Sequence, residues 1–264
     1  MKYGVCIGLD DLDGIKLAAE TGFDYVEFSF QALSRADDEL MDKVVALLSE
    51  CNFKGETANC FIPNSFALTS DEIDKEALAD FIEKGMINGK KVGLETVVFG
   101  SGGAKRIPDG VDYGTAFNRL VDFLRDIAAP IAKKYDVTIV VEPLCKLEVN
   151  IINTVKEGAI LAAVCGMDNV ADLADLYHMV VENDSIENII EVGSLLRHAH
   201  ISCPKADDKG NKRTFMKDIN EYDYKPFIDA LRAVGCPRCS IEGRLATDDK
   251  KEEYRLAYNV LKQL

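Results

Sequence analysis

The stretch Val137-Thr-Ile-Val-Val-Glu142 decides how this 264-residue chain is expected to fold. The run of β-branched residues over 137–141 predicts a strand buried on both faces, which is typical of a parallel sheet covered by helices. An acidic residue, Glu142, follows directly at the carboxyl end of that strand. Because an unpaired buried charge is costly, Glu142 is expected to have a partner or a function.

The same arrangement recurs three times further along the chain. Asp175, His200 and Glu242 stand near the ends of successive predicted strands, at steps of 33, 25 and 42 residues. Each step is close to the length of one strand followed by one helix. Side chains so far apart meet only if the strands are parallel neighbours and the ligands project from the same end. A closed barrel of parallel strands has this geometry.

Strand-like and helix-like runs alternate along the whole chain. One helix is predicted over 12–21 and ends at Gly22, the helix after the third strand begins after Ser70 with Asp71 in its first turn, and a long one spans about 117–131. We therefore predict an α/β fold, a single (β/α)8 TIM barrel over residues 1–264. An open doubly wound sheet is the alternative, although no GxGxxG follows the first strand. The predicted strands cover residues 3–7, 24–30, 53–60, 94–99, 137–141, 170–175, 198–202 and 240–242.

Composition restricts the partners. The chain carries 45 acidic and 31 basic residues, a formal net charge of −14, so nucleic acids and anionic membranes would be repelled. No apolar run approaches the roughly 20 residues of a membrane-spanning helix, and the first residues do not resemble a secretory leader. We expect a cytoplasmic protein. Its eight cysteines form no regular framework and are interpreted as reduced thiols, with Cys236-Pro-Arg-Cys239 forming a turn before a strand.

The four candidate ligands form an oxygen-rich set with one nitrogen donor. Such a set suits a divalent metal, with Mn²⁺ preferred and Mg²⁺, Co²⁺ or Zn²⁺ as alternatives. Four protein groups leave coordination positions for substrate on an octahedral ion. Each residue also has a structural interpretation: Asp175 is able to cap a helix and His200 to be a core imidazole. The agreement of four strand-end positions favours the metal.

Several motifs resemble those of one superfamily. The run Glu142-Pro-Leu-Cys-Lys-Leu-Glu148, followed by Ile151-Ile-Asn-Thr154, resembles a signature of the xylose-isomerase-like sugar isomerases and epimerases. Within that superfamily it is similar to the ketose 3-epimerases and the hydroxypyruvate isomerases. Further motifs follow in the same order, namely Asp175-Leu-Tyr-His178, His198-Ala-His200 and Ser240-Ile-Glu242.

The resemblance implies roles for particular residues. The metal ligands would be Glu142, Asp175, His200 and Glu242. Glu142 and Glu242 would also exchange the substrate proton as the catalytic pair. Candidate substrate-binding residues are Glu148, His178, Arg213 in the loop after the seventh strand, and Arg244, which has a surface salt bridge as its alternative role.

The chemistry implied is metal-dependent isomerisation or epimerisation of a small ketose or hydroxyketone through an enediolate. A dehydratase of a cyclic polyol, similar to inosose dehydratases, would use the same chemistry. A phosphodiester hydrolase is much less favoured, because the zinc cluster of that branch needs many histidines and this chain has three. A non-catalytic sugar-binding protein would show a broken ligand set. The expected partner is a small-molecule sugar, and a homo-oligomer is possible.

Two features near the predicted site stay open. The loop Gly100-Ser-Gly-Gly103, with Lys105 and Arg106, either binds a phosphate through backbone N–H groups or is a tight loop close to the pocket. The chain has no tryptophan, so an aromatic wall over a sugar would have to come from other residues. The candidates are Phe28, Phe61 and Phe66.

Overall fold

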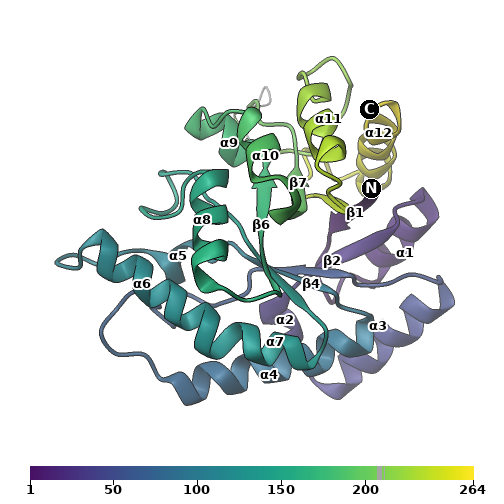
Figure 1. Ribbon diagram of the computed structural model, residues 1–264. Coiled ribbons are helices and arrows are strands. Elements are labelled where there is room, and N and C mark those ends of the chain that lie inside the picture. The colour runs from purple at the N-terminus through teal and green to yellow at the C-terminus, as the bar shows by residue number, and fades with distance from the viewer. Residues whose placement is uncertain (207–209, 211) are drawn as a thin grey trace.

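Eight parallel strands pair in chain order, and the first also pairs with the last. The sheet closes into a barrel, and the helices between strands cover it from outside (Figure 1). The structure is a computed structural model, and it describes residues 1–206, 210 and 212–264. The predicted (β/α)8 TIM barrel is confirmed.

The secondary-structure elements have the following bounds. The strands are β1 (Lys2–Cys6), β2 (Tyr25–Ser29), β3 (Thr57–Asn59), β4 (Thr96–Phe99), β5 (Thr138–Val141), β6 (Val170–Asp175), β7 (Leu196–Ile201) and β8 (Arg238–Ile241). The helices are α1 (Leu12–Thr21), α2 (Phe30–Arg35), α3 (Asp38–Glu50), α4 (Lys75–Val92), α5 (Gly102–Lys105), α6 (Tyr113–Phe123), the π-helix η1 (Leu124–Ala128), α7 (Ala129–Lys134), α8 (Val155–Cys165), α9 (Leu176–Glu182), α10 (Glu187–Val192), the 3₁₀-helix η2 (Gly193–Leu195), α11 (Lys225–Ala233) and α12 (Lys250–Gln263).

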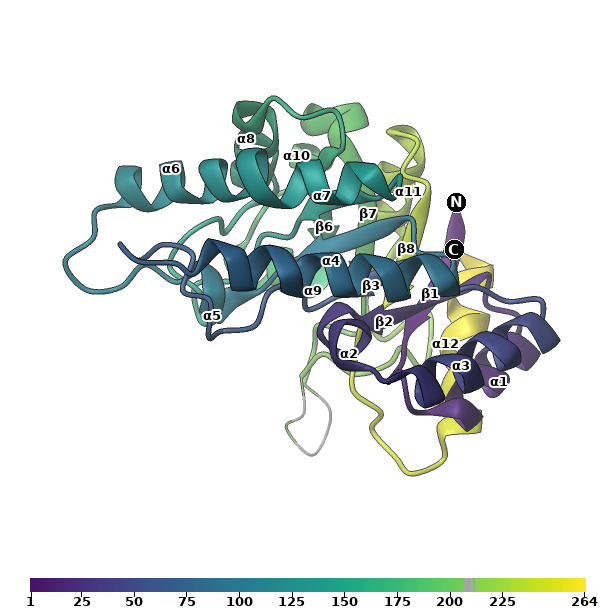
Figure 2. The ribbon, with the colours of Figure 1, turned by 90° about the horizontal axis from the view of Figure 1, so that it is seen from below.

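The pairing of β1 with β8 brings the two ends of the chain together. Both termini lie on the same side of the molecule, in the view of Figure 1 and in the turned view of Figure 2. Figure 2 also shows α4 and the α6–α7 segment lying along one flank of the barrel. Within the described residues, none of the helices has the length and apolar content of a membrane span.

Local sequence signals explain where several helices begin and end. In α1, the Asp11 side chain accepts a hydrogen bond from the Gly14 N–H, and Gly22 closes the helix in the left-handed conformation at φ 106°. The predicted bounds of this helix are confirmed. The predicted start after Ser70 is wrong, because Asp74 accepts from the Ala77 N–H and α4 begins only at Lys75.

The long helix predicted over 117–131 is interrupted. A π-helix, η1, separates α6 from α7, and Pro130 stands at the start of α7. Proline lacks the N–H that an uninterrupted α-helix requires, so the chain adds a wider turn just before it. The apolar stripe remains on the inner face, but the regular i, i+4 pattern does not continue through the segment.

The inside of the barrel has an apolar half and a polar half. The apolar half comes from β4, β5 and β6 and forms a cluster apart from the main core: Val98, Val140, Ala171 and Leu173. The polar half comes from β2, β3, β7 and β8 and is joined by hydrogen bonds: Glu27, Thr57, His198 and Ser240. Beside it, the Tyr25 ring occupies the space that a side chain at position 4 would need. A Cβ on Gly4 would lie 2.2 Å from that ring.

One buried carboxylate on β6 has no hydrogen-bond partner in the part of the chain that the structure describes. Asp172 lies on β6 at a register irregularity against β7, and its side chain faces α8, where a Cβ on Gly158 would lie 2.2 Å from Oδ1. Asp172 is fully buried, and neither carboxylate oxygen has a hydrogen-bond partner within the described residues. Burial raises the pKa of this carboxyl well above 3.8. Asp172 therefore destabilises the fold at the pH values where an ordinary carboxyl ionises.

We expect Asp172→Asn to become more stable relative to the parent as the pH rises. Since the pKa of Asp172 is higher in the folded than in the unfolded state, parent stability falls as the pH rises from the ordinary carboxyl pKa towards the raised one. The difference in unfolding free energy should grow by up to about 1.4 kcal/mol per pH unit in that window. Urea unfolding at pH 5 and pH 8 measures it, with Asp80→Asn on the exposed face of α4 as control. An equal difference at both pH values would contradict this account.

Candidate active site

The four predicted metal ligands meet at the carboxyl ends of the strands. Glu142 and Glu242 follow β5 and β8, Asp175 ends β6, and His200 lies in β7. One donor atom from each lies within 4.8 Å of the other three. Glu142, Asp175 and His200 are buried, and the Glu242 side chain is 22% exposed. The structure thus brings together all four side chains that the strand spacing selected.

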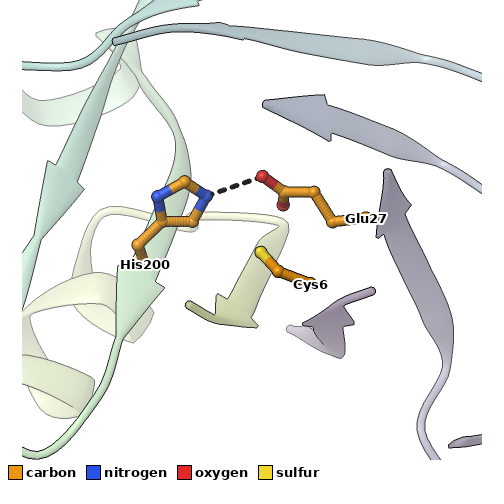
Figure 3. Close-up of side chains that lie close together, drawn as sticks. All are labelled: Cys6, Glu27 and His200. Carbon is orange, nitrogen blue, oxygen red and sulfur yellow. Dashed lines mark hydrogen bonds and ion pairs between the residues drawn. The ribbon is translucent and has the colours of Figure 1, made fainter. Parts of the chain in front are cut away.

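A hydrogen bond to Glu27 orients the imidazole of His200. His200 Nε2 lies 2.8 Å from Glu27 Oε1 (Figure 3), and its Nδ1 lies 3.0 Å from Glu142 Oε1 and 2.9 Å from Glu242 Oε2. With Nε2 donating to Glu27, Nδ1 is directed at the carboxylates: the protonated ring donates to them, and the neutral ring would offer its Nδ1 lone pair to a bound cation. A carboxylate that orients a histidine in this way is a common second partner of metal-binding imidazoles.

Glu27 itself is held by donors from three other strands. Its Oε2 accepts from Ser240 Oγ at 2.6 Å, Thr57 Oγ1 at 2.8 Å and His198 Nε2 at 2.9 Å. Burial alone would raise the pKa of Glu27, but His200 and His198 hold it well below 4.5. Sequence reasoning missed this residue. The available signal was a lone glutamate inside the apolar strand Tyr25–Ser29.

The surroundings shift the protonation of the cluster in opposite directions. Burial would lower the pKa of His200, but the carboxylates of Glu242, Glu27 and Glu142 raise it well above 6.5. Burial, followed by the charge of Glu242, raises the pKa of Glu142. For Glu242, burial is outweighed by Arg213 and His200, which lower the pKa to about 2. The two glutamates are therefore inequivalent in the protein.

Cys6 at the end of β1 lies close to this network. Figure 3 shows its sulfur directed towards Glu27 and His200, and the three donor atoms lie within 4.8 Å of one another. Both oxygens of Glu27 are, however, already engaged by four donors. Burial also raises the pKa of the Cys6 thiol well above 9.0, which keeps it protonated. A second metal at this position is not favoured.

Asp175 both caps a helix and faces His200. Its Oδ1 accepts from the His178 N–H at 3.1 Å and caps α9, while its Oδ2 lies 3.7 Å from His200 Nδ1. The Cys145 N–H donates to His178 Nδ1 at 3.1 Å, so the neutral ring carries its hydrogen on Nε2. That nitrogen faces the guanidinium of Arg213. Glu148 is exposed, and its carboxylate lies within 4.8 Å of the Cys145 and His178 donor atoms.

Arg213 lies across the carboxylates. Its guanidinium donates to Asp175 Oδ2 at 2.6 Å and contacts Glu242 Oε2, while Glu142 Oε1 lies 3.9 Å away. Its NH1 lies 3.2 Å from His178 Nε2, so two donors face each other there. Part of the predicted loop that contains Arg213 lies outside the described residues (207–209 and 211).

The cations after the glycine-rich loop bind the backbone instead of facing a ligand. Lys105 is fully buried and donates to the carbonyl oxygen of Glu142 at 2.7 Å and to that of Phe99 at 3.3 Å. Arg106 donates to the Glu148 carbonyl oxygen. The stretch therefore fits the interpretation as a tight loop near the pocket. Phe28 and Phe61 are fully buried in the core and provide no aromatic wall.

The donor set fits a divalent cation. Three carboxylates and the Nδ1 of an oriented imidazole converge within 4.8 Å, which is an oxygen-rich set of the kind that Mn²⁺, Mg²⁺, Co²⁺ or Zn²⁺ accepts. Carboxylates this close repel one another, and a bound cation would offset that repulsion. The pocket beside them has room for a small ligand: its volume is about 230 Å³, and its polar lining includes Gln31, Asn59, Asn64 and Ser101.

A closed (β/α)8 barrel that gathers three carboxylates and an imidazole at one mouth defines a TIM barrel with a candidate metal centre. The chain belongs to the xylose isomerase-like TIM barrel family, whose model matches residues 15–264. This confirms the resemblance inferred from the motifs.

One curated protein is similar to this chain in sequence, and solved structures share its fold. D-psicose 3-epimerase of Agrobacterium fabrum is 25% identical over 193 residues, which span 70% of this chain and 65% of that protein. The structure of D-psicose 3-epimerase with D-tagatose from Clostridium cellulolyticum has a TM-score of 0.81 at 21% identity, covering 100% of this chain and 98% of that one. The IolI protein with a zinc atom gives 0.75 at 16% identity, covering 100% and 97%.

We expect Glu27→Gln to weaken Mn²⁺ binding by about 10- to 100-fold, the usual effect of losing the partner of a metal-binding histidine. The side-chain amide of the glutamine would place an N–H group among side chains that themselves donate hydrogen bonds to Glu27. His200 would then lose its fixed orientation. Isothermal titration with Mn²⁺ measures the effect, with circular dichroism to verify the fold. Glu20→Gln, an exposed change on α1, is the matched control. Unchanged Mn²⁺ affinity in Glu27→Gln would contradict this role.

Replacing Arg213 should strengthen the binding of Mn²⁺, which is the opposite of the effect expected for Glu27→Gln. Arg213→Gln removes a positive charge that shares the oxygens of Asp175 and Glu242, so Mn²⁺ affinity should rise on the order of tenfold. Arg213→Lys keeps the charge and should stay within a few-fold of the parent. The same titration measures both variants. Weaker Mn²⁺ binding in Arg213→Gln would show that the guanidinium organises the carboxylates instead of competing for them.

Proposed function

We propose that this protein is a divalent-metal-dependent epimerase or isomerase of a small ketose or hydroxyketone, with Glu142 and Glu242 as the acid and base. One observation carries the proposal. Two carboxylates from strands three positions apart in the barrel approach the same imidazole nitrogen, at 3.0 and 2.9 Å. A substrate placed between them would have one carboxylate on each side of a reacting carbon.

The chemistry needs this pair because a C–H next to a ketone is a very weak acid. A cation held by Glu142, Asp175, His200 and Glu242 would polarise the carbonyl and stabilise the enediolate. One glutamate, ionised, removes the proton, and the other, protonated, delivers its own proton to the opposite face, which inverts the carbon. Return by a single glutamate gives aldose–ketose isomerisation.

The other residues near the pair support binding and orientation of a hydroxylated substrate. His178 offers an Nε2 hydrogen whose tautomer is fixed by the Cys145 N–H. Lys105 donates to the Glu142 carbonyl oxygen and holds the backbone that carries this glutamate. Glu27 fixes the orientation of the His200 ring through the hydrogen bond to Nε2. Each of these groups is fixed before substrate arrives, which is what orientation of a reacting carbon requires.

The relatives agree with this chemistry. The curated relative and the structure with D-tagatose are both D-psicose 3-epimerases, and the IolI structure contains zinc. For this chain we propose Mn²⁺ as the working metal. A phosphodiester hydrolase is not supported, because His198 is engaged by Glu27 on the inner side of the barrel and only His178 and His200 remain near the mouth.

Exchange of deuterium from solvent tests the proposal. Mn²⁺-loaded protein in D₂O is incubated with D-fructose, D-tagatose and hydroxypyruvate, and NMR identifies the carbon that gains deuterium. An inverted carbon identifies an epimerase, an aldose product an isomerase, and loss of a hydroxyl a dehydratase. No exchange in any substrate, with the metal shown to be bound, would count against the proposal.

Glu242→Gln should lower the exchange rate by about 10²- to 10⁴-fold, the usual contribution of a general acid or base. The change is isosteric, so the fold should remain, as circular dichroism would verify. Glu142→Gln should have an effect of the same order, because each glutamate serves one face. Glu20→Gln is the matched control and should exchange at the parent rate. Exchange retained in Glu242→Gln would remove this residue from proton transfer.

A further inference from the structure

The mouth of the barrel contains a second hollow beside the amide-lined pocket. It has a volume of about 590 Å³ and is lined by Glu148, Tyr177, Gly210, Lys212, Arg213, Glu242, Gly243 and Arg244. The two hollows share Glu148, Arg213 and Glu242. We call them the inner lobe and the outer lobe. We call Glu142, Asp175 and Glu242 the acidic cluster. A ligand whose reacting carbons lie at this cluster can therefore extend into either lobe.

The two lobes differ in the cations they offer. Lys105 and Arg106 lie near the inner lobe but donate to backbone carbonyl oxygens, and Arg213 is paired with Asp175 and Glu242. In the outer lobe, Lys212 and Arg244 form no ion pair with any described residue. Among the described residues that line it, the outer lobe thus has three cations against two carboxylates, although the whole chain has 45 acidic and 31 basic residues.

Backbone contacts hold the wall of the outer lobe in place. Thr214 forms β-bridges with Cys203 on one side and with Arg244 on the other. The Arg244 N–H donates to the Arg213 carbonyl oxygen at 2.7 Å, and the Phe215 N–H to the Arg244 carbonyl oxygen at 3.1 Å. These contacts join the segments that follow β7 and β8.

Glycine permits this close approach. A Cβ on Gly243 would lie 3.1 Å from the Arg213 carbonyl oxygen, so a side chain there would push the two segments apart. Arg213 itself has a positive φ of 59°, and its guanidinium contacts Asp175 and Glu242. The neighbouring cations Lys212 and Arg244 line the outer lobe. The segments after strands seven and eight are where barrels of this type frequently bind phosphate groups.

From this geometry we propose that the outer lobe is an anion subsite, formed by Lys212 and Arg244, for a substrate with a terminal phosphate or carboxylate. The inference rests on the proposed function for the position of the reacting carbons. An arginine beside a lysine suits either anion, because guanidinium binds oxyanions in a bidentate manner and ammonium adds a point charge. The inner lobe would take the neutral, hydroxylated end of the same molecule through its amides.

Binding of three matched ligands to Mn²⁺-loaded protein tests the subsite. They are D-fructose, D-fructose 6-phosphate and D-fructuronate, which share a ketose and differ in the terminal group. Isothermal titration should show at least tenfold tighter binding of an anionic ligand than of D-fructose. Preference for both anions assigns a general anion subsite, and preference for the phosphate alone assigns a phosphate subsite. Equal affinity for all three would overturn the inference.

Variants separate this subsite from direct binding of the anion to the metal. The double variant Lys212→Gln/Arg244→Gln should lose at least tenfold in affinity for the preferred anion. Lys212→Gln/Arg244→Lys, which keeps one of the two charges, should lose less. The matched control is Lys16→Gln/Arg197→Gln, with one change on α1 and one near the opposite end of β7. Preference for the anion that persists in the double variant would overturn the inference.

The two proposals fail in different ways. Titration measures binding and does not require turnover. An anion preference without deuterium exchange in any of the three ligands would leave the subsite standing and count against the epimerase or isomerase. Exchange of D-fructose with no anion preference would do the reverse.

Discussion

The hydrogen bond between Glu27 and His200 is the contact on which the site depends. A buried carboxylate in the middle of a barrel is tolerated only if its lone pairs are met, because an unpaired buried charge is costly. Here four donors from β3, β7 and β8 meet them, and two of these are imidazoles that face the carboxylate from neighbouring inward positions. One charge therefore joins side chains of four strands, and the same charge directs the Nδ1 of His200 towards the mouth.

Above this network the protein concentrates negative charge. Glu142, Asp175 and Glu242 share one small volume, and His200 and Arg213 supply the only positive charges in direct contact with them among the described residues. The repulsion within such a cluster opposes folding unless a cation offsets it. The arrangement is therefore better explained by binding of a cation than by a contribution to the stability of the fold. Asp172 is a different case: it is buried away from the mouth, touches no partner in the described chain, and offers nothing to a ligand.

Much of the fold was predictable because the signals are local. Buried β-branched runs mark parallel strands, and the spacing of Glu142, Asp175, His200 and Glu242 follows from one strand and one helix per unit. Glu27 was not predictable from spacing, since its role arises from contacts across the barrel between strands that are distant in sequence. Lys105 likewise resembles a ligand-binding cation beside a glycine-rich loop, but the chain turns it inwards to two backbone carbonyl oxygens. The start of α4 depended on a choice among several acidic residues, and only the geometry of Asp74 decides it.

The two lobes suggest how one barrel separates reaction from selectivity. The acidic cluster and Glu27 lie on or next to strands, where register fixes each side chain and leaves little freedom for change. The outer lobe is built from the segments after β7 and β8, whose mutual contacts are a few backbone hydrogen bonds around Thr214 and Gly243. A change at Lys212 or Arg244 alters the charge that a ligand meets without moving a strand. In barrels of this type, loops vary over a fixed strand framework, so under the two proposals the terminal group of a ligand would be selected by different residues from those that handle the reacting carbon.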